Sequence, residues 1–183
     1  MPVLSHTLFL FMSSVMCAGD KPLAAAGEPI VIGFQNPEGD PNGSFPEATL
    51  GAQAAVKYIN EELGGWGSDI QNGVPGRPIQ LEVCKTAISP DDSQRCANEI
   101  VSKEPELAVS TINFFGNHFS IYQGSDIPVL VVSGNQMAQD KVKAFELAKR
   151  LSQQRTFAAL VPVSAKRSFQ LDALADALAE QLP

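Results

Sequence analysis

The sequence predicts an α/β fold built on a parallel sheet, and three observations lead to this prediction. Short apolar runs rich in β-branched residues recur along the chain, beginning with IVIGF at 30–34. Longer segments with helical spacing of apolar residues separate these runs. The composition, 44% hydrophobic and 18% charged, is that of a globular chain. Strands joined by helices of this length pair in parallel through right-handed crossovers.

The first strand and the first helix show the pattern clearly. A strand is predicted at 30–34, and a helix follows it over 44–63, ended by Gly64 and Gly65. We expect one face of this helix to pack on the sheet, and the residues at the required spacing are Leu50, Ala54, Ala55, Tyr58, Ile59 and Leu63.

The later segments repeat the alternation. Strands are predicted at RPIQLEVC (77–84), AVSTI (108–112), IPVLVVS (127–133) and FAALVPVS (157–164). A helix over 89–104 begins with Ser89 as N-cap and Pro90 at the first helical position, and an amphipathic helix closes the chain at 171–182. The expected strand order is 2-1-3-4-5. This is a Rossmann-like sheet of about five strands flanked by helices.

Residues 1–27 are expected to be a leader rather than part of the fold. The run at 4–19 is apolar and resembles the core of a secretory signal peptide, with Ala24 and Ala26 as a cleavage motif, although no Lys or Arg precedes the run. Cys17 offers lipid attachment as an alternative, and a wrongly assigned start is a third interpretation. The expected location is extracytoplasmic, in the periplasm or at the cell surface.

The cysteines are interpreted in the light of that location, because an exported chain meets an oxidising environment. Cys84 ends a predicted strand and Cys96 lies near the start of the next helix, so a disulfide between them is expected. Two separate buried thiols are the alternative. The chain has no CxxC pair, and its two histidines, His6 and His118, are isolated, so no metal site is expected.

Charge and motifs argue against several classes of function. The net charge of −7 disfavours a general nucleic-acid binder. The sequence contains no GxxxxGK[ST] motif and no GxGxxG after the first strand, so nucleotide binding lacks support and no cofactor is expected. The residues also suggest no nucleophile, base and orienting group at one site, and we therefore expect no enzyme activity.

The stretch from 28 to about 133 resembles the first lobe of type I periplasmic binding proteins. The resemblance rests on EPIVIGF, on LGAQAAVKYINEELGG followed by GRPIQLEV, on the SPDDSQRCANEIV segment and on IPVLVVS. It points to the branched-chain amino-acid or amide receptors of ABC importers. It implies a lobe over 28–134 that helps to trap a small polar solute, such as an amino acid or amide, and deliver it to an ABC permease in the membrane.

Ligands of such sheets lie beyond the carboxyl ends of the strands. The resemblance and this rule together predict a binding site from Asn36, Asn113, Phe114, Phe115, Gly116, Asn117, Ser133 and Gly134. The turn after the third strand reads NFFGN where many amino-acid receptors have serines. Two aromatic rings favour a flatter or more apolar solute, oriented by amides. Alternatively, one Phe packs into the core and Asn117 caps the following turn.

The last part of the chain, 135–183, differs from the part before it. It is slightly basic and contains no glycine, whereas the preceding part is strongly acidic. The segment FAALVPVSAKRSFQLDALADALAEQLP resembles the end of an Era-type GTPase domain, with Ser164, Ala165 and Lys166 matching its guanine-facing motif. The NKxD motif and the phosphate loop of that family are missing, which excludes GTP hydrolysis. We expect this tail to complete the sheet with a strand and a helix.

The expected function is an extracytoplasmic solute-binding lobe of an ABC importer, with no nucleic acid as partner. Two alternatives remain open at this point. One is an inactive fusion or truncation fragment in which two families meet near 134. The other is a cytoplasmic interaction module derived from an Era-type GTPase, using its mildly basic tail.

Overall fold

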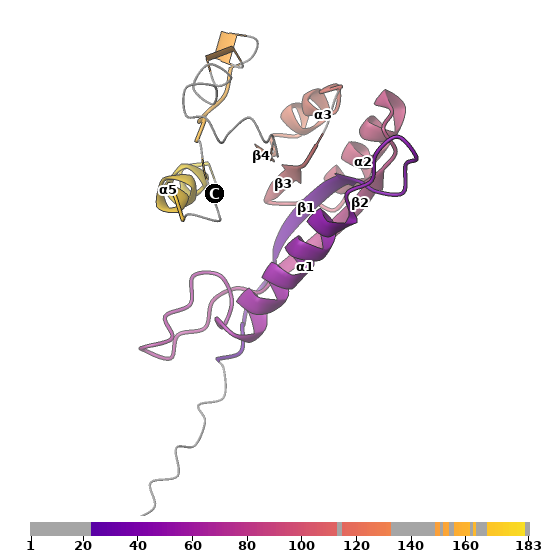
Figure 1. Cartoon of the computed structure of the whole chain (residues 1–183). Coiled ribbons are helices and arrows are strands. Elements are labelled where there is room, and N and C mark those ends of the chain that lie inside the picture. The colour runs from indigo at the N-terminus through magenta and orange to yellow at the C-terminus, as the bar shows by residue number, and fades with distance from the viewer. Residues whose placement is uncertain are drawn as a thin grey trace, which may run out of the picture.

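The structure is a computed structural model of the chain and describes residues 23–112, 115–132, 149–150, 152–153, 156–161, 163 and 168–181. The described elements are β1 (Ile30–Pro37), α1 (Pro46–Glu61), β2 (Ile79–Thr86), α2 (Pro90–Val101), β3 (Leu107–Ser110), α3 (Phe119–Gly124), β4 (Val129–Val131) and α5 (Leu171–Ala179). The strands form one all-parallel sheet in the order β2-β1-β3-β4, with helices beside it (Figure 1). The predicted α/β class with a parallel sheet is confirmed.

Strand β1 is central, and alternate side chains on it face different helices. Gln35 donates a hydrogen bond to Ser93 in α2, while its neighbour Asn36 donates one to Thr49 in α1. A side chain at Gly33 would overlap Ile100 of α2, so glycine here permits the close approach of helix and sheet. Helix α1 therefore covers one face of the sheet and α2 covers the other.

Helix α2 carries the main core. Its first turn is as predicted, because the Ser89 side chain accepts a hydrogen bond from the backbone N–H of Asp92 and Pro90 stands at the start of the helix. Helix α3 was not predicted, since six residues show too little periodicity to be recognised. The buried core cluster on this side of the sheet consists of Cys84, Cys96, Ala97, Ile100, Ala108 and Tyr122.

Helix α1 packs with a different face from the predicted one. Leu50 is 64% exposed and Tyr58 is 57% exposed, whereas Thr49 is the buried residue of the helix. Hydrogen bonds from polar side chains set the orientation of this helix on the sheet. The Asn60 amide donates to the carbonyl oxygen of Ile79 and accepts from its N–H, both at 2.8 Å. Together with the hydrogen bond that Thr49 accepts from Asn36, these bonds turn the predicted apolar face outward.

The connection from α1 to β2 is a tight crossing of two backbone segments. The N–H of Gly76 donates to the carbonyl oxygen of Gly64, and Trp66 and Arg77 form an antiparallel bridge. A Cβ at Gly65 or at Gly76 would collide with the facing backbone. Both positions therefore require glycine.

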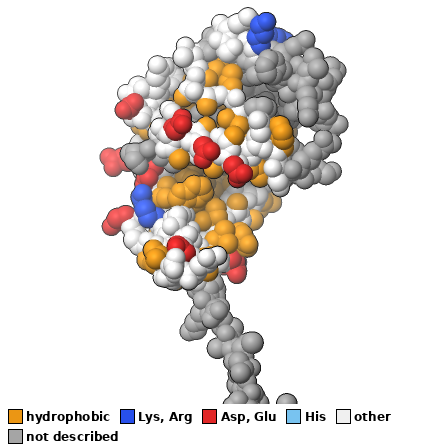
Figure 2. Space-filling view, turned by 90° about the vertical axis from the view of Figure 1, so that its left-hand side faces the viewer, with side chains coloured by type: hydrophobic (Ala, Val, Ile, Leu, Met, Phe, Trp, Pro, Cys, Tyr) orange, Lys and Arg blue, Asp and Glu red, His pale blue; other side chains and the backbone are white. Residues whose placement is uncertain are grey.

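The tail differs from the prediction. Residues 157–161 and 163, which cover most of the fifth predicted strand, form no strand, and the sheet described ends at β4. The predicted closing helix is present as α5, but none of its residues is buried, and it lies apart from the sheet (Figure 1). Figure 2 shows hydrophobic side chains gathered on one face of the molecule, with acidic side chains among them.

Candidate functional site

The carboxyl ends of the four parallel strands meet at one edge of the sheet, which we call the rim. The segments that leave the strands there are 38–45, 87–89 and 111–118. A small hollow lies among them, with a volume of about 10 Å³, which is room for roughly one water molecule. Its walls include Pro37, Thr86, Ser89, Ile112 and Phe115.

Asn36, a predicted ligand residue, lies beneath the rim and is fully buried. Its amide Nδ2 donates to the carbonyl oxygen of Phe45 at 2.7 Å and to Thr49 Oγ1 at 3.0 Å. Its Oδ1 accepts from the Thr111 hydroxyl at 2.7 Å. In this arrangement Asn36 holds the segment after β1 against α1 and β3, and its side chain is not at the surface.

The segment after β3 brings three predicted residues to the rim. Phe115 is 43% exposed and lines the hollow, so this ring does not pack into the core. Gly116 follows with a positive φ of 66°. Asn117 Nδ2 donates to the carbonyl oxygen of Pro90 at 2.9 Å and ties the segment to the start of α2.

The Asn117 side chain does not cap the helix that follows it. His118 is the N-cap residue of α3, and no side-chain hydrogen bond caps that helix. Asn117 Oδ1 is buried and has no hydrogen-bond partner among the described residues. A buried amide oxygen without a partner is unfavourable, so a donor reaching it would gain stabilisation.

Four of the predicted ligand residues cannot be placed. Asn113, Phe114, Ser133 and Gly134 lie outside the described residues, as do Cys17 and the segment 164–166. The part of the predicted site that the structure brings together is therefore Phe115, Gly116 and Asn117, whereas the Asn36 side chain points to the α1 side of the sheet.

A buried polar network supports the rim, and sequence reasoning missed it. Gln35 Nε2 donates to the carbonyl and hydroxyl oxygens of Ser93, each at 3.1 Å, and the Tyr122 hydroxyl donates to Gln35 Oε1 at 2.9 Å. Burial raises the pKa of Tyr122, which keeps its hydroxyl protonated as a donor. The signal in the sequence was the polar pair Gln35 and Asn36 at the end of an apolar strand.

Another buried pair of side chains resembles a catalytic dyad. Ser110 Oγ lies 3.0 Å from His118 Nε2, and both side chains are buried. A nucleophile must reach its substrate, and this serine does not reach the surface. We interpret the pair as a structural link between β3 and α3.

Acidic side chains dominate the electrostatics of the rim. A hydrogen bond from Lys85 holds the pKa of Glu38 below its ordinary value, and backbone N–H groups of Asn42 and Ile88 do the same for the pKa of Asp40. Asp92 has a lowered pKa chiefly because Arg95 donates a hydrogen bond to it. These carboxylates therefore stay ionised at neutral pH.

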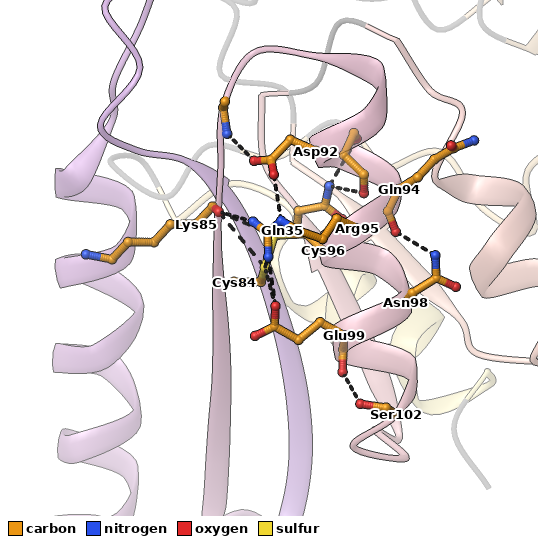
Figure 3. The surroundings of a disulfide bond; sticks show 12 residues. Gln35, Cys84, Lys85, Asp92, Gln94, Arg95, Cys96, Asn98, Glu99 and Ser102 are labelled. Carbon is orange, nitrogen blue, oxygen red and sulfur yellow. Dashed lines mark hydrogen bonds and ion pairs between the residues drawn. A yellow bond between two sulfur atoms is a disulfide. The ribbon is translucent and has the colours of Figure 1, made fainter.

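The predicted disulfide between Cys84 and Cys96 is confirmed, with a Cα–Cα distance of 5.6 Å. It joins β2 to α2 close behind the rim (Figure 3). Arg95 lies over it: its guanidinium contacts Asp92 at 2.6 Å and Glu99 at 2.8 Å, and its N–H groups approach both sulfur atoms. The disulfide is compatible with an oxidising, extracytoplasmic location.

The described residues were also compared with the requirements of a metal site and of a membrane-spanning helix. They contain no group of three or more His, Cys, Asp or Glu side chains placed to hold a metal ion. None of the helices in the described part of the chain has the length and apolar character needed to cross a membrane.

Comparison of the chain with models of protein families, with curated proteins and with solved structures gave no match.

Proposed function

We propose that the chain is a solute-binding lobe of an exported receptor that serves an ABC importer. The solute would be a small polar molecule such as an amino acid or an amide, captured at the rim. The receptor would then present it to a permease in the membrane. The family resemblance of 28–134 suggested this function, and the geometry of the rim supports it.

One observation carries the proposal: an exposed aromatic ring lines a small hollow among the segments that leave the carboxyl ends of parallel strands. Phe115 offers a flat apolar surface at the hollow. Asn117 lies two residues further on, and Ser89 at the start of α2 lines the same hollow. Solute sites combine such apolar walls with a few polar groups that orient the ligand.

The charges of the rim narrow the kind of solute. Glu38 and Asp40 follow β1, and Asp91 and Asp92 occupy the first turn of α2, where the helix dipole would otherwise attract an anion. Lys85, the basic neighbour, is paired with Glu38 at 2.5 Å. A positively charged ammonium group or a neutral amide therefore suits this rim better than a carboxylate does.

The hollow is too small to enclose a solute by itself. Good sites bury roughly 70 to 90% of a ligand, and a lobe with one open side covers only part of it. We therefore expect weak binding, with a Kd of about 1 mM, equivalent to about 4 kcal/mol. Export through the leader, with Cys17 as an alternative lipid anchor, would place the lobe outside the cytoplasm.

The proposal is tested by titrating the isotope-labelled protein with leucine, glutamine, acetamide and butyrate while its NMR spectrum is followed. Leucine, glutamine or acetamide should shift the amide signals of Phe115, Gly116 and Asn117, and butyrate should shift them least. The Phe115→Ala variant should lose about tenfold in affinity, because stacking on one ring contributes about 1 kcal/mol or more.

Phe169→Ala is the matched control. Phe169 is 44% exposed, nearly the same as Phe115, but it belongs to the tail. The control should bind like the unchanged protein. The proposal fails if no solute moves the rim signals, or if both variants lose affinity equally.

A further inference from the structure

The face of the sheet on the α1 side is only partly covered. Side chains alternate along each strand, and Val129 of β4 packs on the core cluster beside α2 and α3, so its neighbour Leu130 points to the α1 side. The same alternation turns Val109 to the α1 side, because Ser110 bonds to His118 on the other. We call Val109, Leu130 and Val132 the open face.

Helix α1 leaves this open face uncovered because it lies over the other half of the sheet. Its Asn60 bonds to Ile79 of β2, and its Thr49 bonds to Asn36 of β1. Val132, whose N–H still continues the ladder by donating to Ser110, is 46% exposed. Val109 and Leu130 are partly exposed, and no helix in the described part of the chain packs over them.

Helix α5 has the complementary surface. Leu171, Leu174 and Leu178 fall on one side of it, three and four residues apart. Asp172, Asp176 and Glu180 repeat every four residues on the other side. None of the three leucines is buried. The chain therefore has an apolar stripe on α5 and an apolar open face on the sheet, and the two are not packed together in this structure.

We propose that α5 docks on the open face beside α1 in a closed arrangement of the molecule. Its leucines would cover Val109, Leu130 and Val132, and its carboxylates would face water. A second helix on the α1 side would give the sheet helices on both faces over its full width, as parallel sheets require.

The covalent connection between β4 and α5 favours α5 of the same chain over any other occupant of the open face. Residues 133–170 connect β4 to α5, and a chain of that length easily spans the sheet. Tethering raises the local concentration of α5 to the millimolar range. A second copy at micromolar concentration is disfavoured by comparison, and its net charge of −7 adds repulsion.

Chemical cross-linking tests the proposal on the full chain. Two double variants are compared, Val132→Cys with Leu174→Cys and Val132→Cys with Asp176→Cys, both carrying Cys17→Ser. A short bis-maleimide is added at several protein dilutions, and products are mapped by mass spectrometry. The Leu174→Cys pair should join within one chain about tenfold faster than the Asp176→Cys pair, at a rate independent of dilution.

Three results would overturn the proposal: equal rates for the two pairs, a faster Asp176→Cys pair, or cross-links mainly between chains, which would assign the face to a second copy. Hydrogen exchange gives a readout without introduced thiols. Replacing Leu171 and Leu178 by Asp should speed exchange of the Val132 amide about tenfold. Asp172→Asn should not, and an unchanged Val132 amide in the leucine variant would also refute the docking.

Discussion

The body of the molecule (23–132) and its tail (133–183) show how differently similar sequence patterns behave. In the body, four strands pair, and α2 buries Cys96, Ala97 and Ile100 against the sheet. In the described part of the tail, α5 forms with a regular apolar stripe but buries no residue. A helix can therefore follow from local sequence alone, whereas a core needs a partner surface.

The strands make the same point. The run at 127–133 and the run at 157–164 are both apolar and rich in valine and leucine. Val129–Val131 pairs with β3, while residues 157–161 and 163 form no strand. The first run follows α3 directly and lies next to β3, but the second has only the far edge of β4 available. Position along the chain, more than composition, separates the two outcomes.

The largest expected difference between the body and the tail is in the unfolding free energy lost when the same kind of apolar group is removed from each. Ile100→Ala should cost about 4 kcal/mol of unfolding free energy, because Ile100 is buried against Gly33 and leaves a cavity. Leu171→Ala in α5 should cost less than about 1 kcal/mol. Urea unfolding followed by circular dichroism measures both, and similar losses would show that the tail is as well packed as the body.

The disulfide gives the second test, since it lies wholly in the body. Replacing Cys84 and Cys96 together by Ala should cost about 3 kcal/mol, because the bridge closes a short loop and restricts the unfolded chain. Reductant should lower the urea midpoint of the unchanged protein and leave the variant unaffected. Cys17→Ser serves as the control and should behave like the unchanged protein, and a reductant effect in the double variant would contradict this account.

Acid sensitivity gives the smallest effect. The pKa values of Glu38, Asp40 and Asp92 are lowered in the folded state, so these groups add stability above the unfolded-state pKa of about 4 and lose it as the pH falls through their folded values. The urea midpoint should be flat from neutral pH to about pH 5 and fall below about pH 4. Asp92→Asn should lower the free energy of unfolding at pH 7 by about 1 kcal/mol or less and make the fall of the urea midpoint in acid shallower. An unchanged fall would place the acid sensitivity elsewhere.

The sequence predicted those features that local chemistry determines. Ser89 followed by Pro90 marked the start of α2, and the spacing of Cys84 and Cys96 predicted the disulfide. The alternation of apolar runs and helical segments predicted the parallel sheet. Each of these depends on residues close together in the chain or on a pattern that few other folds produce.

The features it did not predict depend on distant partners. The apolar pattern of α1 pointed to Leu50 and Tyr58, but a different face packs on the sheet, because Thr49 accepts a hydrogen bond from β1 and Asn60 donates one to β2. Periodicity counts apolar residues and gives no weight to two well-placed polar ones. At the candidate site, Phe115 and Asn117 lie on the rim as the family resemblance suggested, and their role in binding stays a prediction.

The crossing at Gly65 and Gly76 sets a limit on how this chain can vary. Any side chain at either position would force the two backbones apart, and the bridge between Trp66 and Arg77 would open with them. Arg77 would then lose its hold on Glu106 at the start of β3. In a library of random variants selected for a folded body, these two codons should stay fixed as glycine, while Gly124, which has open space around it, should drift freely.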